Sequence, residues 1–253
     1  SLGSVYALIA LGYTMVYGIA KMLNFAHGDV IMIGSYVVYF AFGASGLNPV
    51  LSIVLSMIVC TILGVVIERL AYRPLREAPS LAVLITAIGV SYLLQQVAQL
   101  SWSSNPKSFT SVVSGMKPVS LFGGQLTISA ETIVTIVACV VIMVVLMWFV
   151  NYTPAGHAML AVSEDRGAAQ LMGVNVNGTI SLTFAIGSAL AAIAGALLCS
   201  SYPTLQPTTG AMPGINAFVA AVFGGIVSIP GAFVGGILLG VIEDLSKAYI
   251  STQ

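Results

Sequence analysis

The stretch YTPAGHAMLAVSEDRGAAQLMGVNVN, residues 152–177, is polar and rich in small residues, and it lies between two long apolar runs. The flanking runs have the length and composition of helices that cross a membrane. The polar stretch must therefore leave the lipid, yet it keeps enough helix-forming sequence to offer a docking surface. This contrast predicts a multi-span membrane protein with one structured loop, which is typical of a subunit of a larger assembly.

The composition supports a membrane protein. Of the 253 residues, 58% are hydrophobic and 6% are charged, whereas a soluble domain carries about 25% charged residues. Mean hydropathy is +1.03. Spans in lipid must be helices because every backbone polar group has to be satisfied internally, so we expect an all-α fold. The net charge of zero gives no sign of a surface for nucleic acid.

Six apolar runs precede residue 200, and proline and glycine interrupt the remainder. The six runs are residues 2–20, 30–44, 50–67, 81–100, 132–150 and 180–198. Segments 213–227 and 231–245 are each about 15 residues long, which is short for a full span. They form either half-helices in a hairpin inside the bundle or full spans that include neighbouring polar residues. We expect one transmembrane domain, residues 1–253, with about seven or eight membrane segments.

Small residues at helical spacing predict close helix packing in the last third of the chain. Gly231 and Gly235 are four residues apart, and so are Gly236 and Gly240. Such pairs let two helix backbones approach closely in lipid. Beyond them, we expect Asp244 and Lys247 to pair on one helix face.

The basic residues set the orientation of the chain. Arg69, Arg73 and Arg76 occupy one short loop, and the positive-inside rule places that loop in the cytoplasm. Counting spans from there puts Lys21 and residues 152–177 on the same side. The stretch 152–177 is then a cytoplasmic segment, on the side where ATP is available.

Within this cytoplasmic segment, Thr153 and Pro154 are typical of a helix start. We expect one helix from His157 to Met172, with Gly173 as its C-terminal cap. A charged patch lies at its middle, and a thin helix with such a patch suits a groove on a soluble partner. The predicted coupling residues are Gly156, His157, Glu164, Asp165, Arg166 and Gly173.

A second candidate site combines Asn24, His27 and Asp29 before the second apolar run. Ionisable groups at membrane depth often serve a proton relay. We favour a structural turn near the cytoplasmic interface, with Asn24 or Asp29 capping the next helix and His27 bonded to backbone. Gln95 and Gln96 place amides in the fourth run, where they either line a pathway or bridge helices.

The sequence contains none of the motifs that would make the chain an enzyme. It has no nucleophile–base pair, no metal-ligand spacing and no GxxxxGK[ST] phosphate loop. Cys60, Cys139 and Cys199 each lie inside an apolar run, which predicts buried thiols without a metal. We therefore expect no cofactor in this chain, and any ATP must be hydrolysed by partner subunits.

Five stretches together resemble one known family, the permease subunits of bacterial high-affinity branched-chain amino acid ABC importers. They are SVYALIALGYTMVYGI with LNFAHGD (residues 4–29), ERLAYRPLR (68–76), ITAIGVSYLLQ (85–95), GHAMLAVSEDRGAAQLMGVN (156–175) and FVAAVFGGIVSIPGAFVGGILLGVIE (218–243). The resemblance covers nearly the whole chain in the expected order.

The resemblance implies a multi-pass protein of the bacterial inner membrane that works with several partners. These are ATP-binding subunits docked on residues 156–173, a second related permease, an extracytoplasmic substrate-binding protein and membrane lipid. His157 and Leu160 stand where the family usually has basic residues, so docking would depend more on residues 164–166. The family usually ends with one more apolar span, and we expect both ends of this chain to be trimmed.

Two other functions remain open at this point. The first is an ABC permease for urea or a short-chain amide, since the permease sequence underdetermines the substrate. The second, less favoured, is a stand-alone channel or proton-coupled carrier that uses His27 and Asp29.

Overall fold

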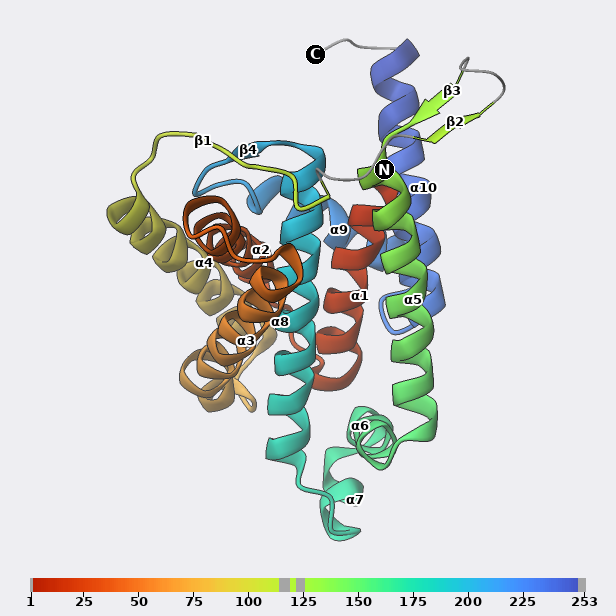
Figure 1. The fold of residues 1–253 in the computed structure, drawn as a ribbon. Helices are drawn as coiled ribbons and strands as arrows, with labels where there is room; N and C mark the ends of the chain where they lie inside the picture. Colours follow the sequence, from red (N-terminus) through yellow and green to blue (C-terminus); the bar gives the residue numbers. More distant parts are fainter. Residues whose placement is uncertain (1, 114–118, 122–125, 250–253) are drawn as a thin grey trace.

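The computed structural model describes residues 2–113, 119–121 and 126–249, and helices dominate them (Figure 1). The long helices are α1 (Leu2–Ala20), α2 (His27–Val38), α3 (Pro49–Ile67), α4 (Ser80–Trp102), α5 (Ala130–Tyr152), α8 (Val176–Ser201), α9 (Ala211–Phe223) and α10 (Ile229–Tyr249). Two short helices, α6 (Pro154–Glu164) and α7 (Arg166–Leu171), connect α5 to α8. A π-helical turn η1 (Tyr39–Ala44) extends α2, and η2 (Glu68–Tyr72) and η3 (Arg73–Leu75) extend α3.

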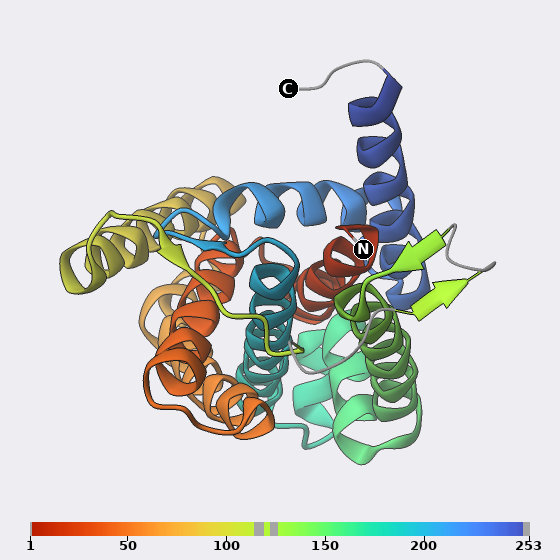
Figure 2. The ribbon, with the colours of Figure 1, turned by 45° about the horizontal axis from the view of Figure 1, so that its top comes forward.

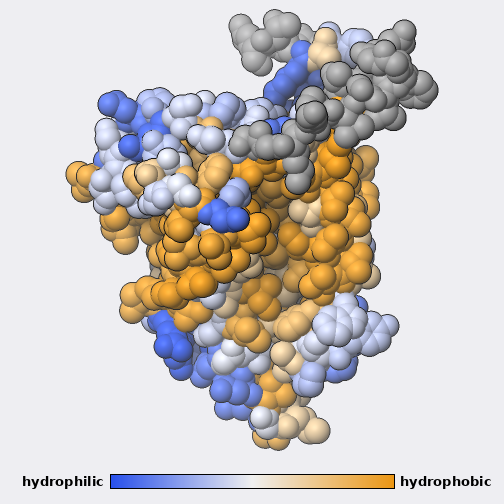
Figure 3. Space-filling view, in the orientation of Figure 1, coloured by the Kyte–Doolittle hydropathy of each residue, from blue (hydrophilic) through white to orange (hydrophobic). Residues whose placement is uncertain are grey.

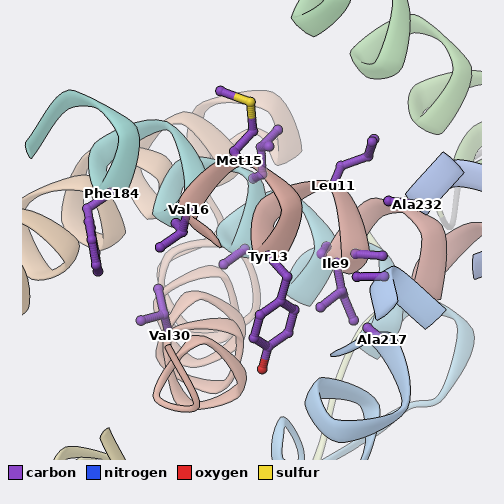
Figure 4. Close-up of a cluster of buried hydrophobic side chains, with 14 of the residues drawn as sticks. Ile9, Leu11, Tyr13, Met15, Val16, Val30, Phe184, Ala217 and Ala232 are labelled. Carbon is purple, nitrogen blue, oxygen red and sulfur yellow. The ribbon is translucent and has the colours of Figure 1, made fainter. Parts of the chain in front are cut away.

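Helix α1 forms the centre of the bundle. In its 18-residue apolar stretch 89% of the residues are buried, whereas in α3, α4 and α5 the share is 28% or less and apolar side chains point outward. Helices α8, α9 and α10 pack directly on α1. Figure 4 shows the resulting core, in which Ile9, Leu11 and Val16 of α1 meet side chains from the surrounding helices. Glycines help the neighbouring segments to surround α1, since Gly3 lies against the backbone of Ile237 and Gly12 lies against the side chain of His27.

The long apolar helices are those of a multi-span membrane protein. Within the described ranges, six helices are long and apolar enough to span a membrane: α1, α3 with its extension to Leu75, α4, α5, α8 and α10. Helix α9 is apolar but shorter than these six. Figure 3 shows a hydrophobic band across this face of the molecule, with hydrophilic surface below it at the end that carries α6 and α7. The all-α multi-pass fold is thus confirmed.

Segments 213–227 and 231–245 form neither two half-helices nor two full spans. Helix α9 has 13 residues, whereas α10 has 21, so one segment is short and the other is a full-length span. Figure 2 shows α9 lying across the bundle, unlike the more upright α10. The turn between them places Val227 beside Gly18, near the end of α1, and Gly225 adopts a left-handed φ of 90°. The Gly225 turn lets α10 run back along α1.

Close packing at the paired glycines is confirmed. Gly236 and Gly240 of α10 lie against the backbone of Ala7 and Gly3 of α1, where an added Cβ would overlap backbone atoms. Gly235 lies in the same way against Ala220 of α9. These contacts bring two helix axes closer than larger side chains permit.

Short strands join loops at the end of the molecule opposite α6 and α7 (Figure 1). Strand β1 (Lys107–Ser108) pairs antiparallel with β4 (Thr204–Leu205), and β2 (Val119–Leu121) pairs with β3 (Leu126–Ile128). These strands could not be predicted from the sequence, because two or three residues show no periodicity.

Candidate functional site

Segment 152–177 begins with a tight turn at the end of α5. The Thr153 hydroxyl accepts a hydrogen bond from the Gly156 amide at 3.0 Å, and Pro154 occupies the first turn of α6. Gly156 lies directly against the carbonyls of Phe149 and Val150, where a Cβ would overlap them. The predicted helix start is confirmed, and the close approach explains why glycine is required at position 156.

The single helix expected from His157 to Met172 is wrong, because the chain breaks at Asp165. Residue 165 has extended backbone angles and separates α6 from α7. Its carboxylate accepts hydrogen bonds from the amides of Gly167 and Ala168, at 2.7 and 3.0 Å. Aspartate competes in this way with helical backbone bonding, so it starts a new helix instead of continuing the old one.

The predicted helix end at Gly173 is confirmed. Gly173 adopts a φ of 86°, and its amide donates to the carbonyl of Gln170 at 3.0 Å. The left-handed φ is strained for any residue with a side chain, and this accounts for glycine here. Asn175 then caps α8 by accepting from the Gly178 amide at 3.0 Å.

Arg166 binds the segment to the central helix α1 and is not available to a partner as part of a charged patch. Its guanidinium donates to the carbonyl of Ala20, the last residue of α1. Burial lowers the pKa of Arg166, and the nearby Arg76 charge lowers it further, but an arginine stays charged at neutral pH. The three residues of the expected charged patch therefore have different roles. Asp165 caps α7 and Arg166 binds α1. Glu164 is exposed and has no partner among the described residues.

The outer surface of the segment ends in two apolar side chains that the sequence analysis missed. Leu171 is 90% exposed and Met172 is 84% exposed, and both lie at the end of α7. By contrast, Met159, Val162 and Ala169 are buried against the bundle. His157 and Glu164 are also exposed. The signal was present, since Leu171 and Met172 directly precede the capping glycine outside every apolar run.

A buried carboxylate joins the neighbouring loop to α8. Glu68 is fully buried and forms an ion pair with Arg76, and it accepts a hydrogen bond from the Ser181 hydroxyl at 2.6 Å. Arg76 also donates to Asn177 in the first turn of α8. Arg76 lines a groove with Arg166 of segment 152–177. The α3 extension, α7 and the start of α8 thus meet at one place.

The second candidate site lies deeper than expected. Lys21 ends α1 in a left-handed conformation, with φ of 54°, and the chain then runs back into the bundle. The ring of His27 lies 4.7 Å from that of Tyr13, and a Cβ at Gly12 would be 2.5 Å from its Nε2 atom. Gly12 is near the middle of α1, so placing His27 and Asp29 at the cytoplasmic interface was wrong.

The predicted helix cap in this site is also wrong. Ala26 precedes α2, and no side chain caps this helix. Asn24 instead accepts from the Tyr72 hydroxyl, and Asp29 from the Gln95 amide, both at 2.9 Å. The Nε2 atom of His27 has no hydrogen-bond partner within the part of the chain that is described.

Of the two glutamines in the fourth run, one joins this buried site and the other does not. Gln95 bridges α4 and α2 through Asp29, whereas Gln96 is exposed on the outer face of α4. All three cysteines are buried and unpaired. Among the described residues, no group of three His, Cys, Asp or Glu side chains is placed to hold a metal ion.

Comparison with known proteins identifies the family. Residues 1–253 match the family described as the permease component of the branched-chain amino acid transport system. The chain belongs to this permease family. It is 44% identical to the high-affinity branched-chain amino acid transport system permease protein LivH of Salmonella typhimurium and 45% identical to BraD of Pseudomonas aeruginosa. Each alignment covers 100% of this chain and 85% of the relative.

An archaeal relative is similar over most of its length. The probable branched-chain amino acid transport permease LivH of Methanocaldococcus jannaschii is 31% identical, over 97% of this chain and 78% of the relative. No solved structure matches the chain.

The buried Glu68 of this permease gives a testable stability prediction. Replacing Glu68 with alanine leaves the Arg76 guanidinium without its carboxylate, and breaking a buried pair from one side costs about 3–5 kcal/mol. We expect thermal unfolding of the purified permease to shift well below that of the wild type. Glu77→Ala removes an exposed carboxylate from the same loop and should change stability by less than about 0.5 kcal/mol. Equal shifts in the two variants would contradict a structural role for Glu68.

Proposed function

We propose that this permease is the membrane subunit of an ATP-driven importer of branched-chain amino acids in the bacterial inner membrane. Residues 1–253 form its permease domain, and residues 152–177 are the cytoplasmic coupling segment. The observation that carries the proposal is the segment itself. Buried residues and Arg166 hold it against the bundle. It nevertheless exposes the apolar side chains of Leu171 and Met172, at the end of the molecule that also carries Arg69, Arg73 and Arg76.

Separate ATP-hydrolysing subunits dock on this segment, because the chain itself has no phosphate-binding loop. Leu171 and Met172 enter a groove of that partner, and His157 and Glu164 contact its rim. Exposed apolar side chains of this size at a segment tip are typical anchors of a helix-in-groove contact. A second related permease and an extracytoplasmic binding protein complete the importer.

Movement of the docked partner reaches the bundle by two contacts. Arg166 transmits a displacement of α7 to the end of α1, which lies at the centre of the molecule. Arg76 links the α3 extension to Glu68 and to the start of α8. The two contacts connect the coupling segment to three spans whose relative positions define the interior of the bundle.

The substrate assignment rests on what the relatives' names state. LivH and BraD are named for branched-chain amino acids, and none of the relatives above is named for urea or an amide. The hydrogen bond from the Gln95 amide gives Asp29 a structural role between α2 and α4. We therefore assign branched-chain amino acids as the transported class.

Purification from the native membrane tests the assembly. A tagged chain extracted in mild detergent should bring with it ATP-binding subunits, a second permease and ATPase activity. Recovery of the chain alone as a homo-oligomer without ATPase activity would contradict the proposal. His27→Ala would then become the next variant, since loss of uptake driven by a proton gradient would support a carrier.

A further inference from the structure

A groove of about 610 Å³ lies on the outer surface between the end of α3 and the start of α8. Its residues fall into two groups. Arg69, Arg73, Asn177 and Ser181 are polar, and Val65 and Leu182 are apolar. The groove is open to the outside of the bundle, so a molecule next to the protein can enter it from that side.

The charge of the groove is strongly positive. Glu68 is the nearest carboxylate along the chain, but its two oxygens are already used by Arg76 and by the Ser181 hydroxyl. Arg69 and Arg73 are exposed, and neither forms an ion pair within the described residues. Two unneutralised guanidiniums one helical turn apart are well suited to a phosphate group.

The apolar side of the groove continues along the outside of α3. Ile58, Ile62 and Val65 precede Arg69 at spacings of three or four residues, which places them on one helix face. Ile58 and Ile62 are 53% and 60% exposed. The same face thus presents aliphatic side chains in the membrane-spanning part of α3 and arginine at its cytoplasmic end. Figure 3 shows hydrophobic surface giving way to hydrophilic surface at the lower edge of the band.

We propose that this groove binds the headgroup of an anionic phospholipid of the cytoplasmic leaflet. The phosphate lies between Arg69 and Arg73, the side-chain amide nitrogen of Asn177 offers a hydrogen-bond donor to the headgroup, and one acyl chain follows Ile62 and Ile58. Anionic headgroups are recognised by basic pockets between spans on the cytoplasmic side. The lipid is the favoured occupant because the aliphatic face and the arginines form one continuous surface, which a soluble protein or a free anion would match only in part.

The test measures lipids retained by the purified full-length permease. The protein is reconstituted in vesicles of equal parts phosphatidylglycerol and phosphatidylcholine, extracted, and analysed by native mass spectrometry. We expect the wild type to retain phosphatidylglycerol preferentially and saturably. In the variant R69Q/R73Q the affinity for phosphatidylglycerol should fall on the order of tenfold, since each basic residue near the surface contributes to binding.

Two controls make the result specific to the groove. K21Q/K107Q removes the same number of charges elsewhere, and it should retain phosphatidylglycerol like the wild type. Ile62→Ala keeps both arginines and should weaken retention of phosphatidylglycerol, because an acyl chain contacts this position. Inorganic phosphate added at the same concentration should not displace the lipid.

Three outcomes would overturn the proposal. The first is equal phosphatidylglycerol retention by R69Q/R73Q and the wild type. The second is displacement by inorganic phosphate with no effect of Ile62→Ala, which would assign the groove to a free anion. The third is loss of co-purifying ATP-binding subunits from R69Q/R73Q with unchanged lipid retention, which would assign it to a protein partner. Because lipid retention is measured on the permease alone, failure here leaves the transport assignment unaffected.

Discussion

Replacing Leu171 and Met172 with aspartate will abolish ATP-driven uptake and release the ATP-binding subunits while leaving the permease folded. Both side chains project from the tip of α7 and make few contacts with the rest of the chain, as their exposures of 90% and 84% show. Loss of one anchor residue in an interface costs about 2 kcal/mol or more. Two introduced carboxylates in a desolvated groove cost more, so we expect co-purification of the ATPase to fall more than tenfold.

Leu47→Asp is the matched control for this prediction. Leu47 is 41% exposed in the loop before α3, at the opposite end of the molecule from α7. It introduces one carboxylate, as each of the two substitutions at the tip of α7 does, on a surface far from the proposed docking site, so subunit recovery should stay at the wild-type level. Normal recovery and uptake in the Leu171→Asp, Met172→Asp double variant would show that the tip of α7 is not the docking surface.

Gly236→Ala will destabilise the permease, although alanine is the better helix former. Gly236 lies on the Ala7 backbone, where even one methyl group overlaps main-chain atoms that cannot move without displacing α1. Overpacking typically costs about 1–3 kcal/mol, and a clash with backbone lies at the upper end. The expected result is a marked fall in the thermal unfolding temperature of the purified chain and in its accumulation in the membrane.

Gly89→Ala makes the same substitution at another helical glycine, and we expect no loss of stability there. Gly89 lies on α4 with nothing within 4 Å of its added Cβ, so only the helix preference acts there. Alanine is favoured over glycine within a helix by about 1 kcal/mol, so this variant should be as stable as the wild type or slightly more stable. A fall of equal size in both variants would show that contact between α10 and α1 does not determine the stability.

Local sequence rules predicted the features that depend on neighbouring residues. The apolar runs predicted the long helices. Thr153 and Pro154 predicted the start of α6, and Gly173 predicted the end of α7. The glycine pairs gave close packing of α10, although not the partner helix. Each of these depends on periodicity, a cap or a missing side chain, which a sequence displays directly.

Contacts that depend on how the chain turns back through the bundle could not be predicted in the same way. His27 was placed at the interface because Lys21 is close in sequence, but the left-handed turn at Lys21 carries the chain back to the level of Gly12. The pairing of Lys247 was also assigned to the wrong acid, since it bonds Glu243 and not Asp244. Likewise, the carbonyl of Ala20 as a partner for Arg166 lies 146 residues away in the sequence.

Uptake of radiolabelled leucine into proteoliposomes tests the central claim most directly. The vesicles contain this permease, the second permease and the ATP-binding subunits that co-purify with it, with the binding protein and leucine supplied outside. We predict uptake that requires ATP on the side of α6 and α7 and that disappears in the Leu171→Asp, Met172→Asp variant. Leucine uptake that needs no ATP and follows an imposed proton gradient would contradict the account.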